Sequence, residues 1–195
     1  MPQDIPRHKT DTKAVIALGS NVACGTHSSE EIVKTALSAI SCESVELLAA
    51  SKLYATPCVP AGAGPDYVNA VALVRTTMAP KDLLARLHGI EADFDRRREG
   101  RWASRTLDLD LLDHGGCVAP DRLTWQEWHD LPFAQQKSRF PDCMILPHPR
   151  IQDRAFVLIP LAEIASEWRH PVLDRNAREL LAELTEDQLA GIHVI

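Results

Sequence analysis

The chain has 195 residues, of which 45% are hydrophobic and 25% are charged, as is typical of a globular domain with a substantial core. Its net charge of -6 at pH 7 argues against a general nucleic-acid-binding protein, because a phosphate backbone recruits a basic surface. The five cysteines contain no Cys-x-x-Cys pair, which argues against a disulfide framework or a zinc site and favours a reducing, cytoplasmic location. No apolar run approaches membrane-spanning length.

The first part of the chain predicts a tail, a strand and a helix. Residues 1–12 are polar, lack the apolar core of a signal peptide and are expected to form a flexible tail. Residues 14–20 (AVIALGS) form an apolar run closed by a glycine, which predicts a buried strand that enters a turn. A helix is expected over 28–40, where Ser28 or Ser29 offers an N-cap ahead of apolar residues at helical spacing.

Three further strands and a second helix follow. Residues 44–55 predict a strand, although their leucine and alanine content leaves a helix open, and the β-branched residues 67–77 predict another strand. Pro80 opens a helix that is expected over 80–97, with its leucines on one face. Residues 107–114 (LDLDLLDH) alternate apolar and polar side chains, which predicts a fourth strand.

The remaining residues predict additions to this unit. A loop with a short helix is expected over 115–147, a short strand and a helical turn over 156–165, and an amphipathic helix over 175–190. The order β-α-β-β-α-β is typical of the α+β class with a ferredoxin-like core, in which both helices pack on one face of a four-stranded antiparallel sheet. The other face is then free to carry a site.

Two neighbouring carboxylates share one face of the fourth predicted strand. Asp108 and Asp110 alternate with leucines, so both acids point to the same side, roughly 6–7 Å apart along the strand. Mg²⁺ is commonly held by one or two carboxylates together with substrate phosphates, so the pair indicates phosphoryl chemistry. The alternative is a polar strand face turned toward solvent.

An arginine-rich segment lies immediately before these acids. A run of charge is usually a solvated surface, but arginines next to a metal-binding pair are the two halves of a triphosphate clamp. Trp102 in this polar segment fits either stacking on a flat ligand or a small apolar cluster. The arginines of the segment are Arg96, Arg97, Arg98, Arg101 and Arg105.

Two other polar positions are candidates for ligand contact. Tyr67 and Asn69 share one face of their strand, and the Asn69 amide can both donate to and accept from an aminopyrimidinone edge. The alternative for both is a polar pair on an exposed strand. His148 is bracketed by prolines in an extended loop, where it serves either a structural role or a phosphate contact.

At these residues the chain resembles the 6-hydroxymethyl-7,8-dihydropterin pyrophosphokinase family of folate biosynthesis. RWASRTLDLDLL (101–112) satisfies every position of the family signature, and the resemblance runs from about residue 14 to about 172. It implies one-step transfer of the pyrophosphoryl group of ATP to the pterin hydroxymethyl oxygen, with release of AMP. Further matching segments are ALGSN (17–21), YATP (54–57), PDYVNA (65–70), Ile90-Glu91 and LPHPRIQDRAFVLIPLAEI (146–164).

The resemblance also implies roles for individual residues. Asp108 and Asp110 would hold two Mg²⁺ ions, with ATP as co-substrate, and would act in catalysis together with Arg96 and Arg105. The implied ATP contacts are Glu91, Arg96, Arg98, Arg105, His148 and Arg154. The implied pterin contacts are Thr56, Pro57, Val59, Tyr67, Asn69, Trp102 and Phe156, with Tyr67 and Phe156 on the two faces of the ring.

The sequence departs from the family pattern in three places. The arginine-rich segment is one residue shorter than a common family form, and Pro149 stands where a tyrosine often occurs. Residues 124–143 look inserted, which weakens the alignment of Arg122 with a family arginine at the ATP site. Within the insertion, Trp125, Trp128, Leu131 and Phe133 are expected to pack a local helix and not to bind a ligand.

The resulting domain organisation is a flexible tail (1–12), one pyrophosphokinase domain (13–172) and a C-terminal helix packed on that domain (173–195). The expected partners are ATP and hydroxymethyl-dihydropterin, with no nucleic acid, no membrane and a monomeric state.

Two other functional classes fit less well. A polymerase-type nucleotidyltransferase also combines a Gly-Ser turn with an Asp-x-Asp strand, but Gly19-Ser20 lies far upstream of Asp108. Such an enzyme releases pyrophosphate, whereas a pyrophosphokinase releases AMP. A ferredoxin-like module for single-stranded RNA needs aromatic stacking platforms and a basic face, and aromatic residues make up 5% of this chain.

Overall fold

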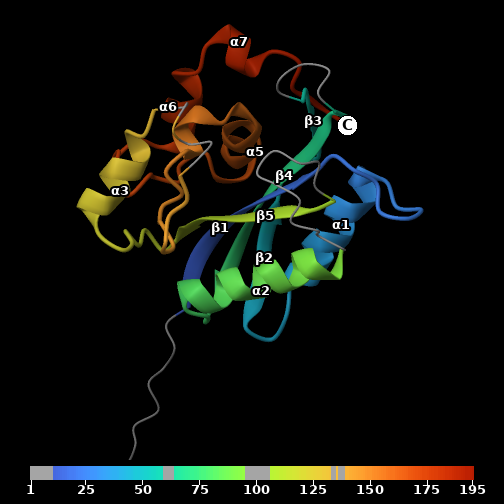
Figure 1. Cartoon of the computed structure of the whole chain (residues 1–195), viewed down its shortest axis with the longest axis horizontal. Coiled ribbons are helices and arrows are strands. Elements are labelled where there is room, and N and C mark those ends of the chain that lie inside the picture. Colours follow the sequence, from blue (N-terminus) through green and yellow to red (C-terminus); the bar gives the residue numbers. More distant parts are fainter. Residues whose placement is uncertain (1–10, 59–63, 95–105, 133–134, 136–138) are drawn as a thin grey trace, which may run out of the picture.

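The computed structural model describes residues 11–58, 64–94, 106–132, 135 and 139–195, which build an antiparallel sheet with helices on both of its faces (Figure 1). In these residues the strand order is β5-β1-β4-β3-β6, and β2 also pairs with β4. The strands are β1 (Thr12–Ser20), β2 (Val45–Ala50), β3 (Tyr54–Thr56), β4 (Tyr67–Thr76), β5 (Asp108–His114) and β6 (His193–Val194). The helices are α1 (Ser29–Ile40), α2 (Pro80–Asp93), α3 (Arg122–His129), α5 (Ala155–Ala165), α6 (Ala177–Ala182) and α7 (Glu186–Leu189), with a 3-10 turn at Ile151–Asp153.

One face of the sheet is covered by α1 and α2, as the sequence predicts (Figure 1). Ser28 is the N-cap of α1 and forms a capping box with Glu31, which resolves the choice between the two serines. Pro80 begins α2, and the helix ends at Asp93, within the range expected for it. The Arg86 side chain of α2 donates to the carbonyl of Ala39 at 2.7 Å, which joins the end of α1 to α2.

The other face is not free, which corrects the expectation of a one-sided layer. Helix α5 packs there against the sheet and α6 packs against α5, in a buried cluster that includes Val15, Val71 and Leu112. The apolar run over 156–165 forms a helix, not a short strand with a turn. A short continuous apolar run fits a buried strand or a helix buried on several sides equally well, so periodicity could not distinguish them.

The predicted strand over 44–55 is split into β2 and β3, which accounts for one strand beyond the expected four. Both pieces pair with β4, and the break lies after Ser51. The Ser51 hydroxyl accepts from the backbone N–H of Val71 at 3.0 Å, and the Lys52 N–H donates to Glu163 of α5 at 3.0 Å. Side chains therefore replace backbone partners at the break.

The alternation of β5 is confirmed by its burial. Leu107, Leu109 and Leu111 pack in the core beneath α1 and α2, whereas Asp108 and Asp110 face the opposite side of the sheet and are partly exposed. A register shift against β1 follows, with Leu111 opposite Ile16 and Asp113 opposite Val15. This bulge places Leu112 in the core beneath α5.

The segment after residue 173 does not form the single expected helix. It forms α6, α7 and the short edge strand β6, which adds the sixth strand. Asn176 and Thr185 each form a capping box, so the second helix begins anew after a break at 183–185. No helix in the described part of the chain is long and apolar enough to cross a membrane.

His170 is fully buried between the aromatic rings of Trp125 and Trp168. Its Nδ1 accepts from the backbone N–H groups of Val172 and Leu173, at 3.2 and 3.1 Å. Burial, with a further contribution from His129, lowers the pKa of His170 to about 4, from an ordinary value of 6.5. The neutral ring is therefore the folded form.

This burial predicts a loss of stability in mild acid. The unfolded chain binds a proton at His170 below pH 6.5 and the folded chain does so only near pH 4, so stability falls as the pH drops through this window. The full loss from this group amounts to about 3 kcal/mol. Urea unfolding at a series of pH values measures it, and His170→Asn, which keeps an acceptor near Nδ1, should show a shallower dependence. Equal slopes for both proteins would contradict this account.

Candidate functional site

The antiparallel register places the candidate residues in one row across the sheet. Gly19 of β1 lies opposite Asp108 of β5 on one side and opposite Asn69 of β4 on the other, and Asn69 lies opposite Tyr54 of β3. Residues directly opposite each other point to the same face. With strands about 4.8 Å apart, the backbones of Asp108 and Asn69 are separated by roughly 10 Å, with only a glycine between them.

Arg154 links the acidic pair to the start of α5. Its Nη1 donates to Oδ2 of Asp110 at 3.2 Å, and its guanidinium carbon lies 5.7 Å from the centre of the Phe156 ring. The Arg154 and Asp110 side chains are 30% and 36% exposed, so the pair remains open to a ligand. A guanidinium in this position can bind a phosphate oxygen while it contacts the carboxylate.

Glu91 is buried beneath the acidic pair. Its Oε1 accepts from the backbone N–H of Leu109 at 2.8 Å, and its exposed fraction is 1%. This contact ties the end of α2 to β5 between Asp108 and Asp110. The structure thus gives Glu91 a clear positioning contact next to the expected metal ligands.

His148 is half-buried in the loop that runs along the edge of β5. Its backbone N–H donates to the carbonyl of Leu112 at 2.7 Å, and its Nδ1 accepts from the backbone N–H of Arg150 at 3.1 Å. Burial and the positive charge of Arg154 hold the pKa of His148 well below its ordinary value. The ring is therefore neutral, and Nε2 carries the proton that it can donate to a phosphate oxygen.

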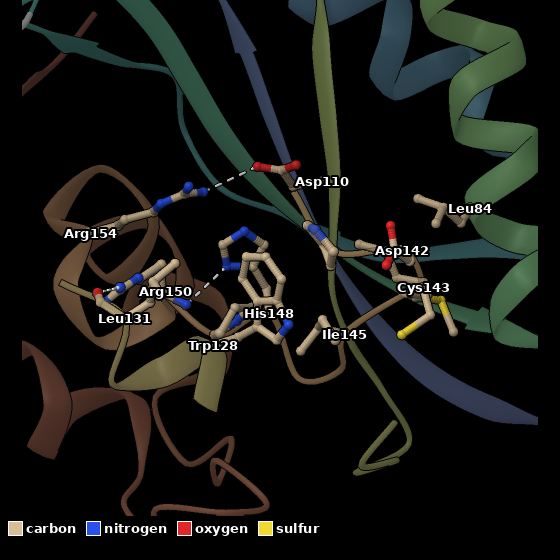
Figure 2. Close-up of a pocket in the computed structure, with 14 residues that line it drawn as sticks. Leu84, Asp110, Trp128, Leu131, Asp142, Cys143, Ile145, His148, Arg150 and Arg154 are labelled. Carbon is tan, nitrogen blue, oxygen red and sulfur yellow. Dashed lines mark hydrogen bonds and ion pairs between the residues drawn. The ribbon is translucent and has the colours of Figure 1, made fainter. Parts of the chain in front are cut away.

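A cavity of about 470 Å³ adjoins these groups. Figure 2 shows Arg154 and Asp110 pointing toward each other, with Leu84 and Cys143 on the opposite side of the cavity. The cavity thus combines cationic and acidic groups with an apolar wall, which suits a nucleotide with its phosphates and base. Its lining residues are Leu84, Asp110, Leu111, Trp128, Leu131, Pro141, Asp142, Cys143, Met144, Ile145, His148, Pro149, Arg150 and Arg154.

The inserted segment forms part of this wall. Trp125 of α3 is fully buried, as expected for a local helix, and its indole N–H donates to the carbonyl of Pro147 at 2.8 Å. The Arg150 guanidinium donates to the carbonyl of Leu131, and Trp128 lines the cavity. The sequence did not predict that Trp128 and Arg150 line the cavity. Which face of the inserted helix meets the cavity depends on tertiary packing, and so does the position of the loop that carries Arg150.

The pterin candidates of β3 and β4 are held together by a side-chain hydrogen bond. The Asn69 amide donates to the hydroxyl of Thr56, and both residues are almost completely buried. Tyr67 is half-buried at the start of β4, and Pro57 is exposed just after β3. Phe156 is the second residue of α5, which packs on the same face of the sheet.

Gly19 lies against the candidate residue Asn69, a contact that the search for reactive side chains missed. A methyl group at this residue would lie 2.9 Å from Oδ1 of Asn69, so the amide of Asn69 occupies the space that glycine leaves. The glycine of ALGSN that closes an apolar run was the available signal. Its meaning required the register between β1 and β4.

Five of the expected site residues lie outside the described residues. They are Val59, Arg96, Arg98, Trp102 and Arg105. Of the expected residues within the described part, the structure brings Asp110, His148 and Arg154 to one cavity and joins Thr56 to Asn69. The weak match of Arg122 gains no support, since its guanidinium donates to the carbonyl of Val172.

The chemistry of the acidic pair fits magnesium with bound phosphates. The described residues contain no group of three or more His, Cys, Asp or Glu side chains arranged to hold a metal ion by themselves. Two carboxylates with further positions left for phosphate oxygens and water match the usual protein contribution to Mg²⁺. Fold and site together define an α+β enzyme for phosphoryl transfer.

Comparison with known proteins identifies the family. A family model described as 7,8-dihydro-6-hydroxymethylpterin-pyrophosphokinase matches residues 15–166. A 2-amino-4-hydroxy-6-hydroxymethyldihydropteridine pyrophosphokinase of Pseudomonas aeruginosa is 37% identical over 171 residues, which cover 87% of this chain and 90% of that protein. The protein of the same name from Haemophilus influenzae is 36% identical over 79% of this chain and 82% of its own length. The chain therefore belongs to the 7,8-dihydro-6-hydroxymethylpterin-pyrophosphokinase family.

Solved structures support the fold. The structure of a Plasmodium falciparum HPPK-DHPS variant with pterin and p-hydroxybenzoate matches 93% of this chain with a TM-score of 0.65 and 15% identity. The match covers 45% of that longer chain. A second Plasmodium falciparum HPPK-DHPS variant, with pteroate, gives a TM-score of 0.64 over 91% of this chain and 41% of its own length.

The contact at Gly19 predicts the effect of a single methyl group. In Gly19→Ala the new Cβ should displace the Asn69 amide and break its bond to Thr56, because the two atoms would otherwise lie 2.9 Å apart. We expect the affinity for a pterin to fall about tenfold, which corresponds to one lost hydrogen bond of about 1.4 kcal/mol. Fluorescence titration measures it. Gly89→Ala on the exposed side of α2, with no atom within 4 Å, is the control and should bind normally.

Proposed function

We propose that the chain transfers the pyrophosphoryl group of ATP to 6-hydroxymethyl-7,8-dihydropterin, giving the pterin diphosphate and AMP in folate biosynthesis. The observation that carries this proposal is the row of Asp108, Gly19 and Asn69, which places an acidic pair and an amide on one face of the sheet. Family membership supplies the reaction. The register supports a common place for both substrates, with the phosphates over β5 and the pterin over β3 and β4.

Asp108 and Asp110 are proposed to hold two magnesium ions along the phosphates. Their carboxylates point to the same face and lie beside the cavity that His148 and Arg154 line. Bound magnesium would neutralise phosphate charge and lower the pKa of the attacking hydroxyl group. The carboxylates fix the position of the reacting groups, which supports an in-line approach of the hydroxyl oxygen to the β-phosphorus.

Arg154 and His148, which line the cavity, are proposed to hold the phosphates. Arg154 offers a planar set of donors next to Asp110, and neutral His148 offers one donor from Nε2. Glu91 acts by positioning β5. Arg96, Arg98 and Arg105 complete the phosphate contacts in this proposal, and their assignment rests on the resemblance to the family.

The pterin is proposed to bind where Thr56 and Asn69 meet. The Asn69 amide retains an acceptor oxygen beside Gly19, which can pair with the amino group of a pterin. Tyr67 and Phe156 are proposed to stack on the two ring faces, since Tyr67 lies opposite Thr56 and Phe156 lies in the first turn of α5, which packs on the same face of the sheet. In this proposal Pro57 and Val59 also line the slot, and Trp102 closes over the pterin.

The proposal extends to the surroundings of the protein. All five cysteines lie in the described residues and none forms a disulfide, which supports a reducing compartment such as the cytoplasm. We also infer a monomer that binds neither nucleic acid nor membrane.

The order β1-α1-β2-β4-α2-β5 supports a ferredoxin-like core to which β3, β6 and the later helices are additions.

The deciding experiment incubates the purified chain with ATP, Mg²⁺ and hydroxymethyl-dihydropterin and measures the nucleotide released. AMP with pterin diphosphate is the expected result. Release of pyrophosphate would point to nucleotidyl transfer, and no Mg²⁺-dependent turnover would refute the proposal. Chelation of Mg²⁺ should stop the reaction, and its readdition should restore it.

Asp110→Ala should lower turnover about a thousandfold or more while the fold stays intact, because the carboxylate acts mainly on the charge of the transition state. Rapid-quench assays give turnover, and thermal unfolding checks the fold. Asp82→Ala, which removes an acid from the exposed first turn of α2, is the matched control. Wild-type turnover in Asp110→Ala would overturn the metal assignment.

Arg154→Lys keeps the positive charge but loses the planar donor set that reaches Asp110. We expect turnover to fall by about tenfold to a hundredfold, with a weaker effect on the KM for the pterin. Arg169→Lys is the control, because Arg169 forms an exposed pair with Asp174 away from the cavity. Steady-state kinetics with each substrate varied in turn distinguishes the two effects. Equal behaviour of the two variants would remove Arg154 from the site.

A further inference from the structure

Residues 191–195 lie along the outer edge of β3, the strand that ends in the proposed pterin contacts. Strand β6 pairs with β3 so that His193 lies opposite Ala55 and Val194 lies opposite Tyr54. The backbone N–H of Ile195 also donates to the carbonyl of Leu53 at 3.0 Å. In Figure 1 this last segment runs beside β3, far from it in sequence.

A second contact fixes the position just beyond β3. Gly191 has φ +77°, a backbone conformation that favours glycine, and a methyl group there would lie 2.6 Å from Cγ of Pro57. The backbone at Gly191 therefore packs closely against the proline ring. Pro57 is restricted to one φ value and cannot easily turn away.

We propose that residues 191–195 are a positioning element for the pterin side of the site. By pairing with β3 and packing on Pro57, they hold the end of β3 at the distance from β4 that the bond between Asn69 and Thr56 requires. This inference rests on the proposed function for its substrate, a flat bicyclic pterin that needs a slot of fixed width.

The physical basis is the short length of β3. With three residues it makes few backbone hydrogen bonds, and without β6 its outer edge would carry unpaired groups. A second element, α5, also holds β3: its Glu163 accepts a hydrogen bond from the Tyr54 hydroxyl at 3.0 Å. That contact holds Tyr54 at the start of β3. Residues 191–195 also pair with Tyr54 and Ala55 and, through Gly191, add a contact with Pro57 just beyond the end of the strand.

The same segment contributes little to the cores. Val194 and Ile195 are 48% and 51% exposed, and neither belongs to the buried clusters of the described residues. Loss of their contacts should therefore change the geometry of β3 more than global stability. This difference makes the inference testable by substrate-specific kinetics.

The main test compares Gly191→Ala with Gly116→Ala. Both glycines have positive φ (+77° and +72°), so both variants carry similar backbone strain, but a methyl group at Gly116 meets only Cβ of Pro171 at 3.8 Å. We expect the KM for hydroxymethyl-dihydropterin to rise about tenfold in Gly191→Ala alone, with turnover and the KM for ATP nearly unchanged. Equal pterin KM values in the two variants would overturn the inference.

Deletion of residues 192–195 gives an independent test, since it removes β6 without adding strain. The pterin KM should rise as in Gly191→Ala, and amide hydrogen exchange at Tyr54, Ala55 and Thr56 should become faster while β1 stays protected. Normal exchange at β3 and a normal pterin KM would refute the positioning role. If the wild-type chain transfers no pyrophosphate, the proposed function fails, and exchange at β3 still decides whether the segment fixes this strand.

Discussion

The pairing of β1 with both β4 and β5 is the constraint on which the site depends. It sets Gly19 between Asp108 and Asn69, so that the acidic pair and the amide share one face with an open position between them. A slip of one residue on either side would turn one partner toward the core beneath α1 and α2. That core fixes the register, because Leu18, Ala70 and Leu109 are all buried in it. The buried face thus determines what the other face presents.

The helices on the second face of the sheet cover only part of that face. Helix α5 covers the half of the face that Val15, Val71 and Leu112 occupy, and its first residues bring Arg154 and Phe156 to the margin of the uncovered half. Arg154 contacts both Asp110 and the Phe156 ring. It therefore lies where the proposed phosphate and pterin positions meet, which agrees with transfer between two substrates held side by side.

Two segments late in the chain border different parts of the proposed site. Helix α3 is joined to the loop of His148 through the bond from Trp125 to the carbonyl of Pro147, and it contributes Trp128 to the cavity wall. Residues 191–195 border β3 and Pro57. The proposed nucleotide and pterin sides thus border separate segments, so that substitutions in one segment should affect one substrate more than the other.

Several features followed from the sequence because they depend on local patterns. The alternation of Leu107, Asp108, Leu109 and Asp110 predicted the two faces of β5, and Ser28 and Pro80 marked the starts of α1 and α2. The antiparallel α+β arrangement is present. The family assignment from the signature over 101–112 is confirmed by the match over residues 15–166, and with it the pyrophosphokinase reaction. The two magnesium ions and the role of each site residue remain predictions.

Other features depended on contacts between distant segments, and for them the sequence carried no sufficient signal. The apolar pattern over 155–165 fits a strand as well as a helix. The tertiary packing decides for a helix with apolar residues on several sides, because the sheet lies on one side of it and α6 on the other. The split of the strand over 44–55 depends on Ser51 and Glu163 supplying side-chain partners from different elements. The need for glycine at residue 19 arises from Asn69, fifty positions away in the chain and adjacent in the sheet. Periodicity and signature residues are local and determined the family and the faces of the strands, whereas register and packing join remote residues and were decided by the tertiary structure.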